Sequence, residues 1–440
     1  MSPIVIAIVM FVTLIIFVLL GYPVAFVFAG LAFIFGLVAE IPSLPTLFAS
    51  RIYGGLMTSY DLVALPLFVF MGVMLERSGL AERLYEAMHI WMGGLRGGMA
   101  IGTIIICTLF AASTGVVGAT VVMMGLLALP SMLSRGYQIE LATGTICAGG
   151  TLGILIPPSI MLIVFGTTAG LSVGKLFMGA IFPGLLLSAL FIAYIAIRCF
   201  FQPRLAPAAP VEERAIPLRR KLSLGLTSLI PPIFLIIAVL GTIFLGIAAP
   251  TEAAAIGAFG SLLLAAGYRR LSPKVLGETA ILTLKMSSMV LFTAVGAFMF
   301  TGVFAAAGAS KAIEELLYAL PMGPWGVLGI MMFILLILGA LLDWISISLI
   351  FIPIFLPIAQ GLGFDPLWFC LLIGIMLQTS FLTPPTAPSI FYLKGACPDE
   401  VEVGSIMRGI IPFLLLQLLG VALIVVFPQI ALWLPGKMIR

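Results

Sequence analysis

Apolar stretches of about 20 residues recur along nearly the whole chain, and this repetition constrains the fold more than any other feature. A helix of that length crosses the roughly 30 Å hydrocarbon layer of a bilayer. Of the 440 residues, 62% are hydrophobic and 9% are charged, whereas soluble domains contain about half and about a quarter. The sequence therefore predicts an all-α polytopic membrane protein and excludes a soluble enzyme.

Charge and rare residues exclude several other classes. The net charge of +4 is dispersed, and no basic run is interleaved with aromatic residues as nucleic-acid binding would require. The five cysteines form no CxxC pair, and one histidine cannot build a multi-histidine metal centre. Motifs of membrane enzymes (DDxxD, HExxH) and of channel filters (TVGYG) are absent from the sequence. We therefore expect no catalytic residue and no organic cofactor.

One long polar segment, residues 198–221, is basic and rich in proline, and we expect it to be a cytoplasmic linker. It separates two halves that share features in the same order. Gly79 recurs 229 residues further on as Gly308, and an amphipathic segment typical of an interfacial helix follows each of them. The proline doublet at 157–158 recurs 227 residues further on at 384–385. These coincidences predict an internal duplication.

Five membrane crossings are predicted in each half. An odd number places the two halves in opposite orientations, which is the inverted-topology arrangement of many transporters. With the linker in the cytoplasm, only five of the 21 basic residues lie outside, so both termini are predicted outside as well. The predicted spans lie near residues 4–20, 22–39, 61–77, 139–171, 175–197, 224–247, 250–268, 281–304, 366–393 and 406–434; the first is expected to be a retained span rather than a cleaved signal.

Residues 98–132 and 323–360 do not fit single crossings. Each is apolar, about 35 residues long, and interrupted halfway by small or polar residues at 112–115 and 343–346. A re-entrant helical hairpin accounts for the length, the break and the odd crossing count. Such a break is tolerated at membrane depth only where protein or a watery cavity satisfies its backbone.

A broken helix is predicted after each hairpin. The segments read GGTLGILIPPS at 149–159 and QTSFLTPPTAPS at 378–389. Paired prolines remove backbone donors and clash with the preceding turn, so each helix should open there. Opened turns expose the carbonyl oxygens and helix ends from which transporters build Na⁺ and anion sites, and nearby hydroxyl groups suit a hard cation. Packing kinks are the simpler interpretation, but two kinks related by duplication favour a site.

Asp343 is the one carboxylate predicted at membrane depth in a hairpin tip. Intramembrane acids are functional candidates by default. The same residue type is also a common cap at the exposed amide end of a helix. The sequence leaves both interpretations open.

These features divide the chain into seven predicted segments. Scaffold helices and an interfacial arm occupy 1–97 in the first half and 222–322 in the second. The hairpin and the broken helix form transport units at 98–171 and 323–395, and a last span follows each unit, at 172–197 and within 396–440. The linker at 198–221 joins the halves.

The motifs resemble those of the large membrane subunit of tripartite ATP-independent periplasmic (TRAP) transporters, the DctM-like family. The resemblance runs over essentially the whole chain, through GYPVAF at 21–26, ERSGLAERL at 76–84, AASTGVVGATV at 111–121, GGTLGILIPPS at 149–159, LLD at 341–343 and TSFLTPP at 379–385. It implies an elevator-type transporter of the bacterial inner membrane that moves Na⁺ and a small organic anion. It also implies two partners, a small membrane subunit and a periplasmic substrate-binding protein.

The resemblance further implies which residues hold the ions and the substrate. QTSFLTPP followed by YLKG is similar to a subgroup associated with 2-oxo or hydroxy acids. Many members carry Gly-Ser-Ser where this chain has Ser113-Thr114-Gly115. The implied Na⁺ residues are Ser113, Thr114, Gly115, Gly150, Thr151 and Pro157 for a first site and Asp343, Ser346, Thr379, Thr383 and Pro384 for a second, with Ser159 and Thr386 near the substrate between them.

A stand-alone Na⁺/dicarboxylate or arsenite-type carrier would share the hairpins and the broken helices. Co-purification with a small membrane subunit would separate the two alternatives.

Overall fold

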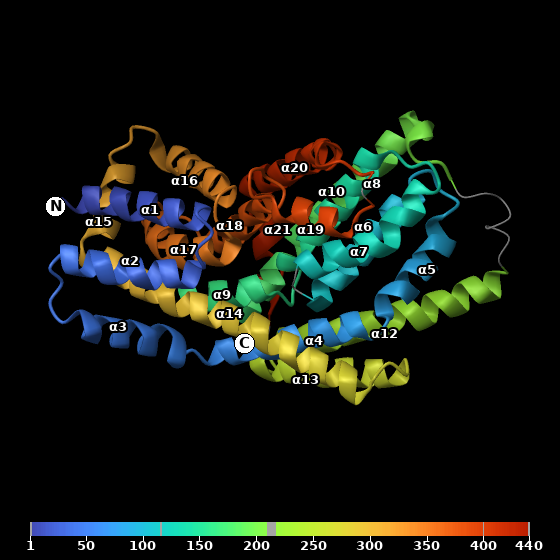
Figure 1. Cartoon of the computed structure of the whole chain (residues 1–440), viewed down its shortest axis with the longest axis horizontal. Coiled ribbons are helices and arrows are strands. Elements are labelled where there is room, and N and C mark those ends of the chain that lie inside the picture. Colours follow the sequence, from blue (N-terminus) through green and yellow to red (C-terminus); the bar gives the residue numbers. More distant parts are fainter. Residues whose placement is uncertain (1, 115–116, 209–216, 399, 439–440) are drawn as a thin grey trace.

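The computed structural model describes residues 2–114, 117–208, 217–398 and 400–438, and every regular element within them is a helix. Figure 1 shows a two-ended arrangement: α1, α2 and α15–α17 lie at one end, and α5–α8 and α12 lie at the other. The predicted all-helical membrane architecture is confirmed.

The first half contains the helices up to the linker. Its elements are α1 (Pro3–Leu19), α2 (Val24–Val38), α3 (Leu44–Ile52), η1 (Tyr53–Met57), η2 (Tyr60–Val63), α4 (Ala64–Arg77), α5 (Leu80–Met92), α6 (Gly98–Thr114), α7 (Val117–Leu133), α8 (Ile139–Thr151), η3 (Leu152–Ile154), α9 (Ile160–Ala169), α10 (Val173–Phe201) and η4 (Pro203–Leu205).

The second half repeats the order of the main helices. Its elements are α12 (Leu218–Phe244), α13 (Pro250–Gly267), α14 (Pro273–Ala306), α15 (Ala309–Tyr318), α16 (Gly323–Gly339), α17 (Trp344–Gly361), α18 (Pro366–Ser380), α19 (Pro388–Ala396), α20 (Val403–Val426), α21 (Gln429–Leu432) and η5 (Pro435–Lys437).

The two halves match in helix position and in packing. Helix α5 begins after Gly79 and α15 begins after Gly308, and both glycines have the positive φ that favours this residue type. Two pairs of contacts between helices correspond: α2 packs on α14 and α13 on α4, while α9 packs on α17 and α19 on α7. The second arm of each broken helix therefore lies against the hairpin of the other half. The opposite membrane orientation of the halves stays a prediction.

Six helices in the described part of the chain are long and apolar enough to cross a membrane, or seven if the bent pair at 44–57 and 60–77 is one span. The predicted span at 61–77 is the second arm of this pair, and the arms meet at 62°. The first arm was not predicted because its glycines and polar residues interrupt the hydropathy. Its counterpart in the second half, α14, is one unbroken helix of 34 residues.

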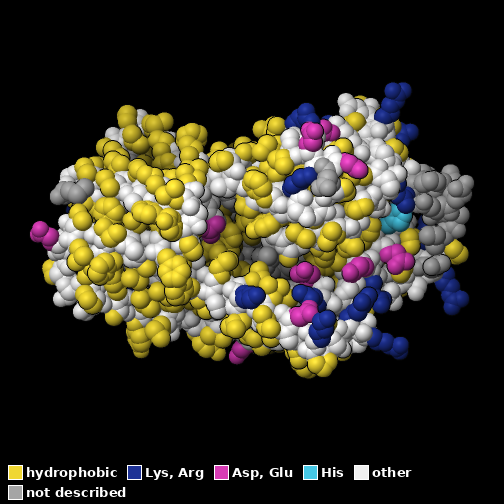
Figure 2. Space-filling view, in the orientation of Figure 1, with side chains coloured by type: hydrophobic (Ala, Val, Ile, Leu, Met, Phe, Trp, Pro, Cys, Tyr) yellow, Lys and Arg dark blue, Asp and Glu magenta, His cyan; other side chains and the backbone are white. Residues whose placement is uncertain are grey.

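Helices extend into both ends of the predicted linker. Helix α10 continues to Phe201 and α12 begins at Leu218, since polar and basic residues can extend a span beyond the apolar layer. Figure 2 shows most of the visible Lys and Arg side chains at the end that carries α5 and α12, while the opposite end is largely hydrophobic. This asymmetry agrees with a cytoplasmic linker, which stays a prediction.

Candidate functional site

Helices α6 and α7 run inward from one end of the molecule, and α16 and α17 run inward from the opposite end (Figure 1). Helices α6 and α7 form the first hairpin, and α16 and α17 form the second. Of the predicted first tip, Ser113 and Thr114 are the last residues of α6, and Gly115 lies outside the described residues. The side chains of Ser113 and Thr114 are likewise outside the description, so their contact with an ion stays a prediction.

Both predicted breaks are present. Helix α8 ends at Thr151 and α9 begins at Ile160, while α18 ends at Ser380 and α19 begins at Pro388. The proline doublets lie inside the breaks, and both have cis peptide bonds, which include the predicted site residues Pro157 and Pro384. The opened backbone in each half is thus where the sequence predicted it.

The second tip and the second break are in direct contact. The Thr386 hydroxyl donates a hydrogen bond to the carbonyl oxygen of Ala340, at 3.0 Å. Gly339 lies so close to Ser380 that a Cβ on the glycine would be 2.7 Å from the serine Cβ. The family resemblance implied that this tip and this break lie together, and the small residue at 339 allows the close approach.

Asp343 is the N-cap of α17. One carboxylate oxygen accepts hydrogen bonds from the backbone N–H groups of Ile345 and Ser346, at 2.9 and 3.2 Å, and the other accepts from the Ser346 hydroxyl. Asp343 is nevertheless exposed and lines a cavity, while Ser346 is buried. The capping interpretation is therefore seen in the structure, and a further role as a Na⁺ ligand stays a prediction.

Thr379 and Thr383 lie at the end of α18 and in the turn that follows it. The Thr379 hydroxyl donates to the carbonyl oxygen of Met376 at 2.6 Å, and the Thr383 hydroxyl donates to that of Thr379 at 2.8 Å. A hydroxyl that donates its proton to the backbone keeps its oxygen lone pairs for another partner. Both threonines are thus compatible with the predicted cation site.

In the first half, the end of α8 is pressed against the returning hairpin helix α7. A Cβ on Gly150 would be 2.3 Å from Cγ2 of Val121, so only glycine fits at this position. Thr151 is fully buried, and its hydroxyl donates to the carbonyl oxygen of Ala148 at 2.8 Å.

The hydroxyl oxygen of Thr151 also accepts two hydrogen bonds that the sequence did not predict. They come from the side-chain amides of Gln378, at 3.3 Å, and Gln417, at 3.0 Å. Both glutamines are fully buried, and their amide oxygens have no hydrogen-bond partner among the residues that the structure describes. A glutamine inside the apolar run LLLQLL at 414–419 is a polar intramembrane residue, and that signal could have identified Gln417.

The two predicted substrate residues have different surroundings. Thr386 lines the larger of two central cavities. Ser159 is the N-cap residue of α9, is fully buried, and donates its hydroxyl proton to the carbonyl oxygen of Ile154. Ser159 lines neither of the two central cavities. Of the two predicted substrate residues, only Thr386 lines a cavity.

Two neighbouring cavities occupy the centre of the molecule, with volumes of about 580 and 470 Å³. The smaller one is lined by both hairpins, through Gly118 of the first and Trp344 of the second. Among the described residues that line them, Asp343 and Glu76 are charged and none is Lys or Arg. The five residues shared by the two cavities are Met289, Trp344, Ile345, Phe381 and Tyr392.

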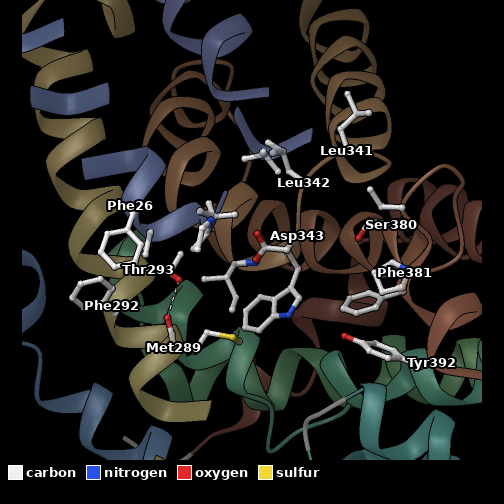
Figure 3. A pocket seen from close by; sticks show the side chains of 18 residues that line it. Phe26, Met289, Phe292, Thr293, Leu341, Leu342, Asp343, Ser380, Phe381 and Tyr392 are labelled. Carbon is white, nitrogen blue, oxygen red and sulfur yellow. Dashed lines mark hydrogen bonds between the residues drawn. The ribbon is translucent and has the colours of Figure 1, made fainter. Parts of the chain in front are cut away.

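Figure 3 shows how the larger cavity is enclosed. Asp343 lies between a wall from α18 and α19 and a wall from α2 and α14. The first wall contributes Ser380, Phe381 and Tyr392, and the second contributes Phe26, Met289, Phe292 and Thr293.

A solved structure has the same fold as this chain. The chain superposes on the YdaH transporter of Alcanivorax borkumensis with a TM-score of 0.58, covering 90% of each chain at 18% sequence identity. At this identity the likeness shows the fold alone, which is all-helical.

Sequence relatives then define the family. Residues 11–430 match the family described as "Tripartite ATP-independent periplasmic transporter, DctM component". The chain is 34% identical to the C4-dicarboxylate TRAP transporter large permease protein DctM of Pseudomonas aeruginosa, over 86% of each protein. It is 31% identical to the ectoine/5-hydroxyectoine TRAP transporter large permease protein UehC of Ruegeria pomeroyi, over 96% of this chain and 97% of that protein.

The chain therefore belongs to the DctM family of TRAP transporter large permeases, as the sequence motifs predicted. It is a multi-pass protein of the bacterial inner membrane. The family is one of transporter permeases rather than enzymes.

Proposed function

We propose that this chain is the translocating subunit of a TRAP transporter that takes up a small organic anion, driven by Na⁺. The observation that carries the proposal is the central cavity lined by both hairpins and bordered by the second break. A carboxylate-bearing solute in this space would meet the exposed helix ends and hydroxyl groups from which anion sites are built.

The coupling to Na⁺ is supported by the side chains around the two central cavities. Asp343 and the threonines at the second break supply oxygen atoms, which are the ligands that hard cations prefer. Among the described residues, no cationic side chain lines the two cavities. A bound anion would then need Na⁺ as its counter-charge, because an unpaired charge is strongly disfavoured in a low-dielectric site.

Relatives support the class of substrate and the partners. Proteins similar to this chain are named for C4-dicarboxylates, for ectoines and for isethionate, which are small polar or charged solutes. We extend this to a small organic anion such as a 2-oxo or hydroxy acid for this chain. A periplasmic binding protein would deliver the substrate, and a small membrane subunit would complete the complex.

Uptake in proteoliposomes tests the proposal. The vesicles contain this chain with its small membrane subunit, and the substrate-loaded binding protein is added outside. We expect uptake with an inward Na⁺ gradient and none when K⁺ replaces Na⁺. Full uptake without Na⁺, driven by a proton gradient, would refute Na⁺ coupling, and full uptake without the binding protein would favour the stand-alone carrier.

A further inference from the structure

A separate polar cavity lies away from the transport site, where the start of α8, the end of α10 and the first part of α20 meet. Its volume is about 240 Å³. The residues that matter for its chemistry are Gln138, Glu140, Tyr194, Arg198, Arg408 and Phe413.

The cavity has an excess of positive charge that is held in place. Arg198 donates hydrogen bonds to the hydroxyl of Tyr194 and, at 3.5 Å, to the side-chain oxygen of Gln138. Arg408 donates to the Ser405 hydroxyl at 3.2 Å and lies 3.6 Å from the Glu140 carboxylate. Two guanidinium groups and one carboxylate therefore line the cavity, and each guanidinium has five N–H donors. Among the described residues, few of these donors have a partner, so the remaining donors can bind an anion.

The surroundings of the cavity are those of a bilayer surface. Ile197, Phe200 and Phe201, on the last turns of α10, are 59%, 72% and 76% exposed. Exposed aromatic and aliphatic side chains beside basic residues are typical of the boundary between headgroups and acyl chains. The positive-inside rule predicts this end of α10 on the cytoplasmic side, and the cytoplasmic leaflet is the one rich in anionic lipids.

We infer that Arg198 and Arg408 bind the phosphate diester of an anionic phospholipid, whose acyl chains run along the exposed end of α10. Arginine pairs bind phosphate oxygens through parallel N–H donors, and basic pockets between membrane helices hold anionic headgroups. The two arginines would recognise a phosphoryl anion. A lipid is favoured over free phosphate because the exposed apolar side chains lie on the same end of α10 as Arg198.

Thermal unfolding of the full chain in mixed micelles tests this site. Phosphatidylglycerol should raise the melting temperature, while phosphatidylcholine at the same mole fraction and inorganic phosphate should not. Arg198→Gln and Arg408→Gln should each raise the half-saturating phosphatidylglycerol fraction about fivefold, since one basic residue near a lipid surface contributes about 1 kcal/mol. Lys311→Gln, which changes an exposed lysine on α15 at the other end of the molecule, should leave it unchanged.

Glu140→Gln separates lipid binding from simple loss of folding, because removing the competing carboxylate should lower the half-saturating fraction. An unchanged response to phosphatidylglycerol in the double variant Arg198→Gln/Arg408→Gln would overturn the inference. Equal protection by phosphatidylcholine would also overturn it, and equal protection by inorganic phosphate would overturn the assignment to a lipid.

Discussion

Thr151 and Gln378 occupy equivalent positions in the two halves, 227 residues apart, and they are hydrogen-bonded to each other across the interface between the halves, at 3.3 Å. Each is the residue at or near the end of the first arm of a broken helix. Gln417 of α20 joins the same hydroxyl at 3.0 Å. The two breaks are thus tied together by one buried polar cluster, which we expect to hold them in a fixed relative position.

The first prediction concerns this cluster. Thr151→Val removes the acceptor of both amide groups and leaves two buried donors unpaired, so it should destabilise the protein by about 1–3 kcal/mol. Gln417→Leu removes both a donor and an amide oxygen without a partner, so it should be nearly neutral. Thermal unfolding of the single variants and the double variant measures the coupling. Strictly additive effects of Thr151→Val and Gln417→Leu would contradict the cluster.

The second prediction concerns Asp343, for which a capping role and a Na⁺-binding role predict different results. Asp343→Asn should keep the fold, because the amide oxygen can still cap α17. It should raise the Na⁺ concentration for half-maximal uptake, since a neutral oxygen is a weaker ligand for a hard cation than a carboxylate. Uptake as a function of Na⁺ is measured alongside the melting temperature. Unchanged Na⁺ dependence in a folded variant would leave Asp343 as a cap alone.

The third prediction tests the close contact between the first broken helix and its hairpin. Gly150→Ala places a Cβ 2.3 Å from Val121, and such overpacking usually destabilises by about 1–3 kcal/mol. We expect a lower melting temperature together with slower uptake. Gly329→Ala, in the middle of α16 with no atom within 4 Å of the added Cβ, is the matched control and should not destabilise. Equal effects of the two variants would argue against a packing role for Gly150.

The fourth prediction is the membrane topology. Arg204→Cys, in a background where Cys397 is replaced by serine, introduces an exposed thiol inside the predicted linker, while the other four native cysteines are buried. We expect an impermeant thiol reagent to label it only after the inner membrane is opened, because the basic residues concentrate on the linker side. Labelling from the periplasm of intact cells would reverse the predicted orientation.

Local chemistry made much of the fold predictable. Both breaks are present at the proline doublets 157–158 and 384–385, where they were predicted, although the doublet at 231–232 lies inside the unbroken helix α12. The glycines at 79 and 308 mark the starts of the two arm helices for a similarly local reason, since each has a positive φ. Residues 44–57 were missed because a short amphipathic helix has no strong hydropathy signal.

The tertiary structure decided which of the predicted site residues contact one another and which of them line a cavity. Sequence placed Ser159 and Thr386 at equivalent proline doublets, yet only Thr386 reaches a cavity, because the Ser159 hydroxyl turns back onto the carbonyl of Ile154. The pairing of Thr151 with Gln378 and Gln417 depends on the packing of α8, α18 and α20, which are far apart in sequence. The sequence alone predicted the apolar spans and the two breaks, because both depend on neighbouring residues. The cavity and its polar partners depend on long-range packing, which no local pattern encodes.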